Sequence, residues 1–274
     1  RIRKGLAQAG KTGWVYIIDR TNGEPLVGID EKPVPQESRQ MTSATQPVPV
    51  GDAFVSQTLD IPAEGFELAN GGAIFTPFWE DPILLRRSEA NWPPSAVDPL
   101  SGVMYVCAGE RQAAYSTREG FEQVEPGERY VAGSMRFAPI ATTGVVAAVD
   151  LRTNKLVWSQ RWPSRCYSGL VASAGGLVFA GRNDGRLTAM DSRNGKKLWE
   201  FMTDAGVNAP PTIYEHNGKQ YIAVLSAGNL LASTKHGDSV WVFGLDEDGL
   251  ESTIQIEEIT PPLANDQGLA LYRQ

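Results

Sequence analysis

The chain has 274 residues, 42% of them hydrophobic, with 28 glycines, 18 prolines and a formal net charge of −7. This composition is typical of one large, turn-rich β unit, and no apolar run approaches the roughly 18 residues of a membrane span. The acidic balance argues against nucleic acid or an anionic membrane surface as the main partner.

The first half of the chain predicts short strands separated by two long loops. A strand pair is expected within residues 1–27, around the sequence Gly-Trp-Val-Tyr-Ile-Ile-Asp. Residues 28–73 are rich in Pro, Gln, Ser and Thr and have little periodicity, which indicates a long loop. Ser101-Gly102 is predicted as a hairpin turn that leads into a strand over 103–107. Residues 109–135 are polar and acidic, which favours a solvated loop over a metal site.

The second half carries the strongest strand signals. Asn183-Asp184-Gly185 and the turn ending at Asn194-Gly195 separate alternating apolar runs, and these residue types tolerate the positive φ of hairpin turns. No helical periodicity intervenes, and residues 246–274 read as an irregular acidic tail. The predicted strands cover 177–180, 186–190, 197–199, 212–214, 220–224 and 239–245.

A repeated unit appears within these strands. Ala189-Met190-Asp191 is followed by Gly195 and Trp199, and Ala148-Val149-Asp150 is followed by Asn154 and Trp158. Corresponding residues are 41 apart (191 − 150 and 199 − 158), within the period of roughly 40–50 residues expected of propeller blades. A degenerate copy runs from Ile17 to Gly23, with Val27 where the Trp should be. Four-stranded blades with a Trp large enough to fill the space between neighbours predict a β-propeller.

This pattern resembles the tryptophan-docking repeat of the pyrroloquinoline quinone (PQQ) dehydrogenases. Roughly four blades fit within the chain, whereas that family closes its ring with eight. The resemblance therefore implies an all-β fold in which residues 1–274 form a single partial propeller, about half of a ring. An open fan leaves sheet surface unburied, so we expect a second chain or an N-terminal half to complete it. The chain begins at Arg1 without a signal-like segment, which favours a mature or processed product, or a fragment.

Several kinds of chemistry lack support in the sequence. The chain has two histidines, His216 and His236, which disfavours a histidine-based metal site or a Ser-His-Asp triad. It has no Cys-x-x-Cys-His, no P-loop and no GxGxxG. Any redox chemistry would then need an organic cofactor. Cys107 and Cys166 leave two alternatives open, a disulfide or buried free thiols, and the second is favoured.

The resemblance points to Lys11 as a catalytic and cofactor-binding residue. Residues 11–23 are similar to the family segment Lys/Arg-Asn-Gly-Phe-x-Tyr-x-Leu-Asp-Arg-Thr-x-Gly, whose basic residue bonds the reactive carbonyl of PQQ. A fixed cation stabilises a carbonyl oxygen that gains negative charge in the transition state. Without the motif, Lys11 would read as an ordinary surface lysine.

Three further stretches match cofactor-binding positions of the family. Asn91-Trp92 resembles an Asn-Trp pair whose amide bonds the rim of PQQ, although an Asn that starts a turn is the alternative. Tyr167 falls where the family often has a Trp beneath the plane of PQQ. Asn229, Leu230 and Leu231 fall where methanol-type members carry Gly-Gly-Trp. Residues 234–238 instead resemble the sugar- and quinate-type branch, which leaves the substrate class open.

The resemblance thus implies part of a PQQ-dependent dehydrogenase that oxidises an alcohol or a sugar hydroxyl. The catalytic Asp and the ligands of Ca²⁺, or of a lanthanide, would lie on the other half of the propeller, so no metal ligand is assigned here. A cytochrome c-type protein would accept the electrons, and the location would be periplasmic. The alternative is a non-enzymatic PQQ-like propeller that serves as a protein-binding scaffold, such as the outer-membrane assembly lipoproteins.

Overall fold

The computed structural model describes residues 3–59, 68–117, 126–127, 133–138 and 142–244. Their regular structure consists of strands and one short 3₁₀ turn, η1 (Ala69–Gly72). The strands are β1 (Gly5–Ala9), β2 (Val15–Asp19), β3 (Ile29–Pro33), β4 (Thr45–Pro49), β5 (Ile83–Ser88), β6 (Ala96–Asp98), β7 (Val103–Thr117), β8 (Gly133–Phe137), β9 (Thr143–Asp150), β10 (Lys155–Trp162), β11 (Leu170–Ala172), β12 (Leu177–Gly181), β13 (Arg186–Asp191), β14 (Lys197–Met202), β15 (Thr212–His216), β16 (Lys219–Ser226) and β17 (Ser239–Gly244). Among the described residues, no helix is long and apolar enough to cross a membrane.

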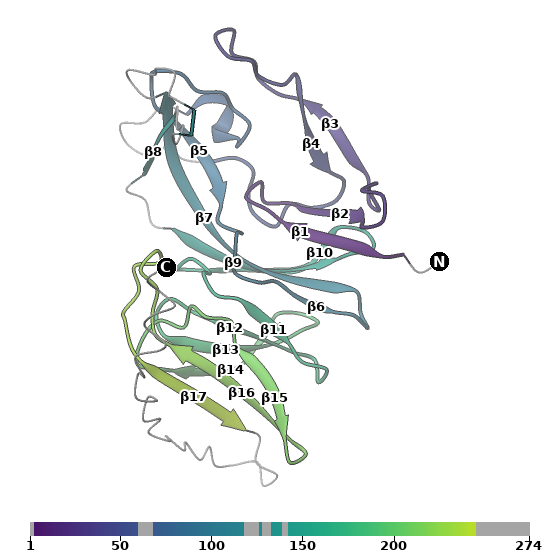
Figure 1. Cartoon of the computed structure of the whole chain (residues 1–274), viewed down its shortest axis with the longest axis vertical. Coiled ribbons are helices and arrows are strands. Elements are labelled where there is room, and N and C mark those ends of the chain that lie inside the picture. The colour runs from purple at the N-terminus through teal and green to yellow at the C-terminus, as the bar shows by residue number, and fades with distance from the viewer. Residues whose placement is uncertain (1–2, 60–67, 118–125, 128–132, 139–141, 245–274) are drawn as a thin grey trace.

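Apart from the small β3-β4 sheet, four antiparallel sheets follow one another in chain order and stack like an open fan (Figure 1). They are β1-β2, a sheet built on β6-β7-β9-β10, then β11 to β14, and finally β15 to β17. The second sheet also contains β5 and β8, which pair with the far half of the 15-residue strand β7. This arrangement confirms the all-β partial propeller, although the strand number differs from four in three of the four sheets.

Alternation of side chains along β7 builds two neighbouring cores from a single strand. Met104, Val106 and Ala108 pack toward β1 and β2, while Tyr105 and Cys107 pack toward the sheet of β11 to β13. Successive residues of a strand point to opposite faces, so a strand buried on both faces is apolar throughout. The third core joins β13 to β16 and includes Leu187, Ile222 and Val224.

The predicted docking of tryptophan between blades is confirmed for Trp158. Its Nε1–H donates to the carbonyl oxygen of Ser192 in the next blade, 2.9 Å away. A Cβ on Gly195 would lie 2.7 Å from a ring atom of Trp158, and Gly195 has φ of +73°. Both facts require glycine in this turn, because a side chain there would collide with the ring and strain the backbone. In the preceding blade Asn154 adopts the left-handed conformation instead, with φ of 56°, and its Nδ2 donates to Val15 O of the first sheet.

Two predicted loops are wrong in part. Residues 28–73 contain the hairpin β3-β4 and η1, with residues 60–67 outside the described part. The hairpin is largely exposed and has proline in both strands, so it shows neither the apolar alternation nor the composition of a central strand.

Residues 109–117 belong to β7 rather than to a loop. Their polarity suggests a solvated loop, but the charge of Glu110 is compensated inside the sheet. Its buried carboxylate forms an ion pair with Arg86 at 2.7 Å and accepts a hydrogen bond from the hydroxyl of Thr143. Most of the remaining predicted loop lies outside the described residues, as does the predicted tail, 246–274.

Candidate functional site

The predicted site residues lie on four connections between strands. Lys11 is in the β1–β2 turn, Asn91 and Trp92 are in the β5–β6 loop, Tyr167 is in the β10–β11 loop, and residues 229–231 are in the β16–β17 loop. These connections come from all four sheets of the fan and are up to 220 positions apart in the chain (231 − 11). A line of contacts joins them.

Arg165 is the centre of that line. Its Nη1 contacts both carboxylate oxygens of Glu89, at 3.3 and 3.4 Å, and its Nη2 donates to the carbonyl oxygen of Leu231 at 2.6 Å. Ser88, which precedes Glu89, donates its backbone N–H to the carbonyl oxygen of Lys11 at 3.3 Å. The β1–β2, β5–β6, β10–β11 and β16–β17 connections are therefore linked side by side.

Trp92 and Tyr167 form an aromatic pair across two of these loops. The rings meet edge to face at 5.5 Å between centroids, and Trp92 Nε1–H donates to the Tyr167 hydroxyl at 2.9 Å. The guanidinium of Arg165 lies over the Tyr167 ring, 4.9 Å from its centroid. Tyr167 is 7% exposed and Trp92 is 50% exposed. The ring of Trp92 is thus accessible to a ligand, whereas the buried Tyr167 holds Trp92 in place.

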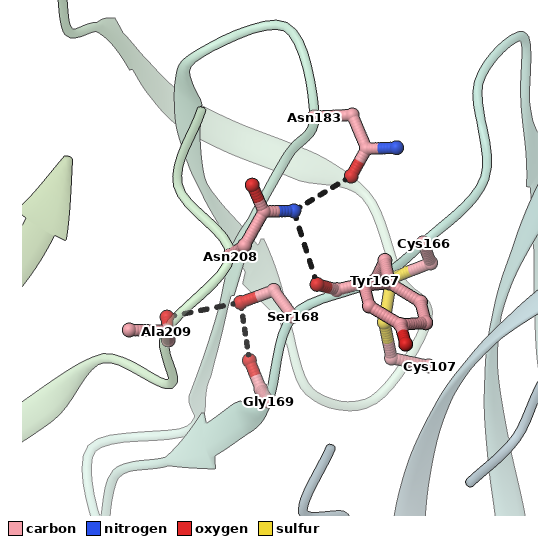
Figure 2. Close-up of a disulfide and its surroundings, with 8 residues drawn as sticks. All are labelled: Cys107, Cys166, Tyr167, Ser168, Gly169, Asn183, Asn208 and Ala209. Carbon is pink, nitrogen blue, oxygen red and sulfur yellow. Dashed lines mark hydrogen bonds between the residues drawn. A yellow bond between two sulfur atoms is a disulfide. The ribbon is translucent and has the colours of Figure 1, made fainter. Parts of the chain in front are cut away.

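A disulfide between Cys107 and Cys166 anchors the Tyr167 loop to β7 (Figure 2). The preference for free thiols is therefore wrong. Both sulfur atoms are buried where β7 meets the following loop, so each half-cystine fits the apolar pattern that also describes a free thiol. The spacing of 59 residues carried no information about this proximity.

Asn208 holds the other side of the same loop. Its Nδ2 donates to the carbonyl oxygen of Tyr167 at 3.1 Å and to Oδ1 of Asn183 at 2.8 Å (Figure 2). Its Oδ1 accepts from the Thr234 hydroxyl at 2.7 Å, and Thr234 Oγ1 accepts the backbone N–H of Asn229 at 2.7 Å. Asn208 is buried, so this network fixes the Tyr167 backbone relative to the base of the β16–β17 loop.

The site carries more positive than negative charge among these contacts. Glu89 pairs with both Arg165 and Arg111, each at 3.3 Å from Oε1. One carboxylate thus serves two guanidinium groups in a partly buried place, where charges interact more strongly than in water. This excess of positive charge is suited to an anionic ligand.

A cavity of about 300 Å³ lies next to the aromatic pair. It is lined by the first strand, by the β5–β6 loop and by β7, and its walls include Asn91, Trp92, Gln8 and Met104. The side chain of Asn91 is exposed, so its amide is accessible to a ligand. Lys11 is exposed as well and lies beside a smaller depression that also includes Thr12, Arg86 and Ser88.

The β16–β17 loop presents two leucines to solvent. Leu230 and Leu231 are 80% and 69% exposed, whereas Asn229 uses its Oδ1 to accept the backbone N–H of Ala232. The Asn229 oxygen is therefore engaged within the turn, and the accessible groups of this stretch are apolar.

Sequence reasoning missed Arg165, Glu89 and Asn208. None stands in a recognisable motif, and their hydrogen bonds described above join positions 22 to 76 apart. The sequence held a signal for Arg165 alone: an arginine two residues before Tyr167 is a candidate cation for an aromatic site. Among the described residues, no group of three or more His, Cys, Asp or Glu side chains could hold a metal ion.

The comparisons with known proteins identify the class. The family model described as "Glucose/ethanol/alcohol dehydrogenase, beta-propeller domain" of PQQ proteins matches residues 1–222. Because the match covers most of the chain, the chain belongs to this family of PQQ dehydrogenase propellers.

Two curated relatives show how much of a longer protein this chain matches. The quinoprotein ethanol dehydrogenase of Pseudomonas aeruginosa is 28% identical over 89% of the chain and 40% of its own length. The quinoprotein glucose dehydrogenase A of Acinetobacter calcoaceticus is 30% identical over 86% of the chain and 37% of its own length. The chain thus spans about two fifths of the length of these relatives.

Solved structures show the same fold. The quinohemoprotein alcohol dehydrogenase of Comamonas testosteroni superposes with a TM-score of 0.59 at 24% identity, over 88% of this chain and 36% of that one. A europium-containing methanol dehydrogenase superposes with a TM-score of 0.55 at 23% identity, over 83% of this chain and 37% of that one. Both matches support a partial propeller.

Proposed function

We propose that this chain is part of a PQQ-dependent dehydrogenase that oxidises an alcohol or a sugar hydroxyl. Family membership supports the class of reaction. The observation that carries the proposal is the convergence of the four stretches containing Lys11, Asn91–Trp92, Tyr167 and 229–231 on linked loops.

The donor set of these loops fits the chemistry of PQQ. The cofactor is a planar quinone with three carboxylates, so it needs cations, amide donors and a flat apolar surface. Lys11 offers an exposed cation, Asn91 offers an accessible amide, and the exposed ring of Trp92 offers a flat surface. When bound, PQQ supplies the carbonyl that accepts hydride.

Each residue of the chain then has a defined task. The Lys11 ammonium is the fixed cation that stabilises developing negative charge on an oxygen of the cofactor. Asn91 orients the cofactor by a hydrogen bond, and Trp92 holds its ring, itself held by Tyr167. Leu230 and Leu231 exclude water from one side of the site.

The rest of the machinery is proposed to lie outside this chain. The other half of the propeller, as a second chain or as further sequence, would supply the base that removes the hydroxyl proton and the ligands of Ca²⁺ or a lanthanide. One relative, from Methylorubrum extorquens, is named a lanthanide-dependent methanol dehydrogenase. A cytochrome c-type acceptor and a periplasmic location complete the proposal.

Replacement of Lys11 by Ala tests the proposal. In the complete PQQ-loaded protein, with the other half of the propeller present, dye-linked alcohol oxidation is expected to fall about 100-fold, because loss of one such preorganised group costs that much. Lys155→Ala, which removes an exposed lysine at the start of β10, is the matched control and should leave the rate unchanged.

Two results would contradict the proposal in different ways. An unchanged rate in Lys11→Ala would remove Lys11 from the mechanism. A wild-type protein that binds no PQQ at all would favour the scaffold alternative.

A further inference from the structure

Arg165 contacts more of the candidate site than any predicted residue does. Its side chain is 10% exposed, and it reaches the β5–β6 loop through Glu89, the β16–β17 loop through Leu231 O, and the ring of Tyr167. A guanidinium offers five donors in a rigid plane, and it can bond a carboxylate and a carbonyl while its face stacks on a ring. A lysine has a single point charge and cannot make all three contacts.

The β16–β17 loop is held at two separate places. Its base is held by backbone bonds, from Gly228 N–H to Gly206 O and from Gly237 N–H to Ala227 O, and by the Asn208–Thr234 bond. Its tip carries the exposed Leu230 and Leu231, and the Arg165–Leu231 bond reaches that tip from another loop. Base and tip can therefore be separated experimentally.

The contact with Glu89 extends this tether toward Asn91. Glu89 donates its backbone N–H to Gly109 O at 2.7 Å, so its backbone is fixed on β7. Its carboxylate then holds Arg165, and Asn91 and Trp92 follow within three positions. The position of the leucine tip is in this way coupled to the position of the Asn91–Trp92 stretch.

We infer that Arg165 is a positioning residue, which ties the Leu230–Leu231 tip to the loop of Tyr167 and so completes the cofactor site. It acts through other residues rather than on the reacting atoms. The inference concerning the cofactor rests on the proposed function, whereas the tether itself does not.

The tether is tested by hydrogen–deuterium exchange of the PQQ-free protein with Arg165→Gln. Exchange is expected to rise about tenfold within residues 230–233, at the amides of Ala232 and Ser233, which donate to Asn229 Oδ1 and Leu230 O inside the tip. The reason is that the charge-assisted bond fixing Leu231 is lost. The amides of Gly228 and Gly237 are expected to keep their protection, since their bonds do not involve Arg165. A general loss of folding would raise exchange at both places and is thereby distinguished.

Two variants sharpen the test. Arg111→Gln removes the other partner of Glu89, and among the described residues Arg111 contacts neither Leu231 nor Tyr167, so the exchange of the tip should not change. Arg165→Lys keeps the charge but loses the planar fork, and it should loosen the tip as Arg165→Gln does.

The consequence for the site is measured by calorimetric titration with PQQ. The dissociation constant of Arg165→Gln is expected to rise about tenfold, because without the bond to Leu231 the tip must be ordered when PQQ binds. Unchanged exchange at 230–233, full rescue by lysine, or an unchanged PQQ affinity beside a loosened tip would overturn the inference. A wild-type protein that binds no PQQ would contradict the proposed function but would leave the exchange result to decide the tether.

Discussion

At the scale of single residues, the repeated aspartates act as caps of the blade turns. Asp191 accepts from the backbone N–H of Arg193 at 2.9 Å and from its guanidinium at 2.7 and 3.0 Å. The hydrogen bonds from the Arg193 guanidinium contribute most, and the bond from the Arg193 backbone N–H contributes next, to lowering the pKa of Asp191 to about 2. Asp150 makes the same contacts with Arg152, and its pKa is lowered for the same reason. The two copies of the repeat therefore share the same Asp–Arg turn structure as well as the same sequence pattern.

This cap predicts an acid-sensitive contribution to stability. The unfolded carboxyl titrates near 4 and the folded one near 2, so the unfolded chain binds more protons between these values and stability falls as the pH falls. Wild type should therefore melt at a higher temperature than Asp191→Asn at pH 6, and the difference should shrink as the pH falls from 4 to 2. Thermal melts across this range check it, with Glu24→Gln as an exposed control. A difference that is the same at pH 6 and pH 2 would contradict the assignment.

At the scale of elements, sequence reasoning succeeds where a contact is repeated and fails where it is unique. Trp158 and Gly195 could be predicted because the spacing of 41 residues recurs. The outer half of β7 was hidden because ion pairing buries Glu110, and the hairpin β3-β4 was hidden because most of it is exposed. Arg165 was missed because its partners lie 66 and 76 positions away.

The disulfide joins β7 to the loop that carries Arg165 and Tyr167. We expect its removal to lower the stability of the whole fold and to loosen this loop. Cys107→Ala with Cys166→Ala should lower the free energy of unfolding by about 2–4 kcal/mol, since the cross-link restricts the unfolded chain. It should also raise hydrogen exchange in residues 165–169. Chemical denaturation with and without reductant measures the first effect, and the double variant should no longer respond to reductant. Equal stability of wild type and variant would contradict the structural role of this bond.

At the scale of the whole molecule, the fan presents an exposed apolar face on its last sheet and an exposed leucine on its first. On the first sheet Leu6 is exposed on the face opposite the core. On the last sheet Val240 and Leu225 are direct neighbours on the outward face, with Val242 beside them, and all three are exposed. Apolar sheet faces are normally covered, and further blades of the same kind are the natural cover. The chain spans 40% of the length of one relative, which is consistent with this expectation.

The central claim is that this partial propeller belongs to a larger PQQ-binding protein. Native mass spectrometry of the protein as isolated from its source, followed by the same sample denatured, tests it most directly. We expect more polypeptide than the 29.7 kDa of this chain, together with PQQ and a metal ion that are released on denaturation. A species of 29.7 kDa that carries neither would contradict the account.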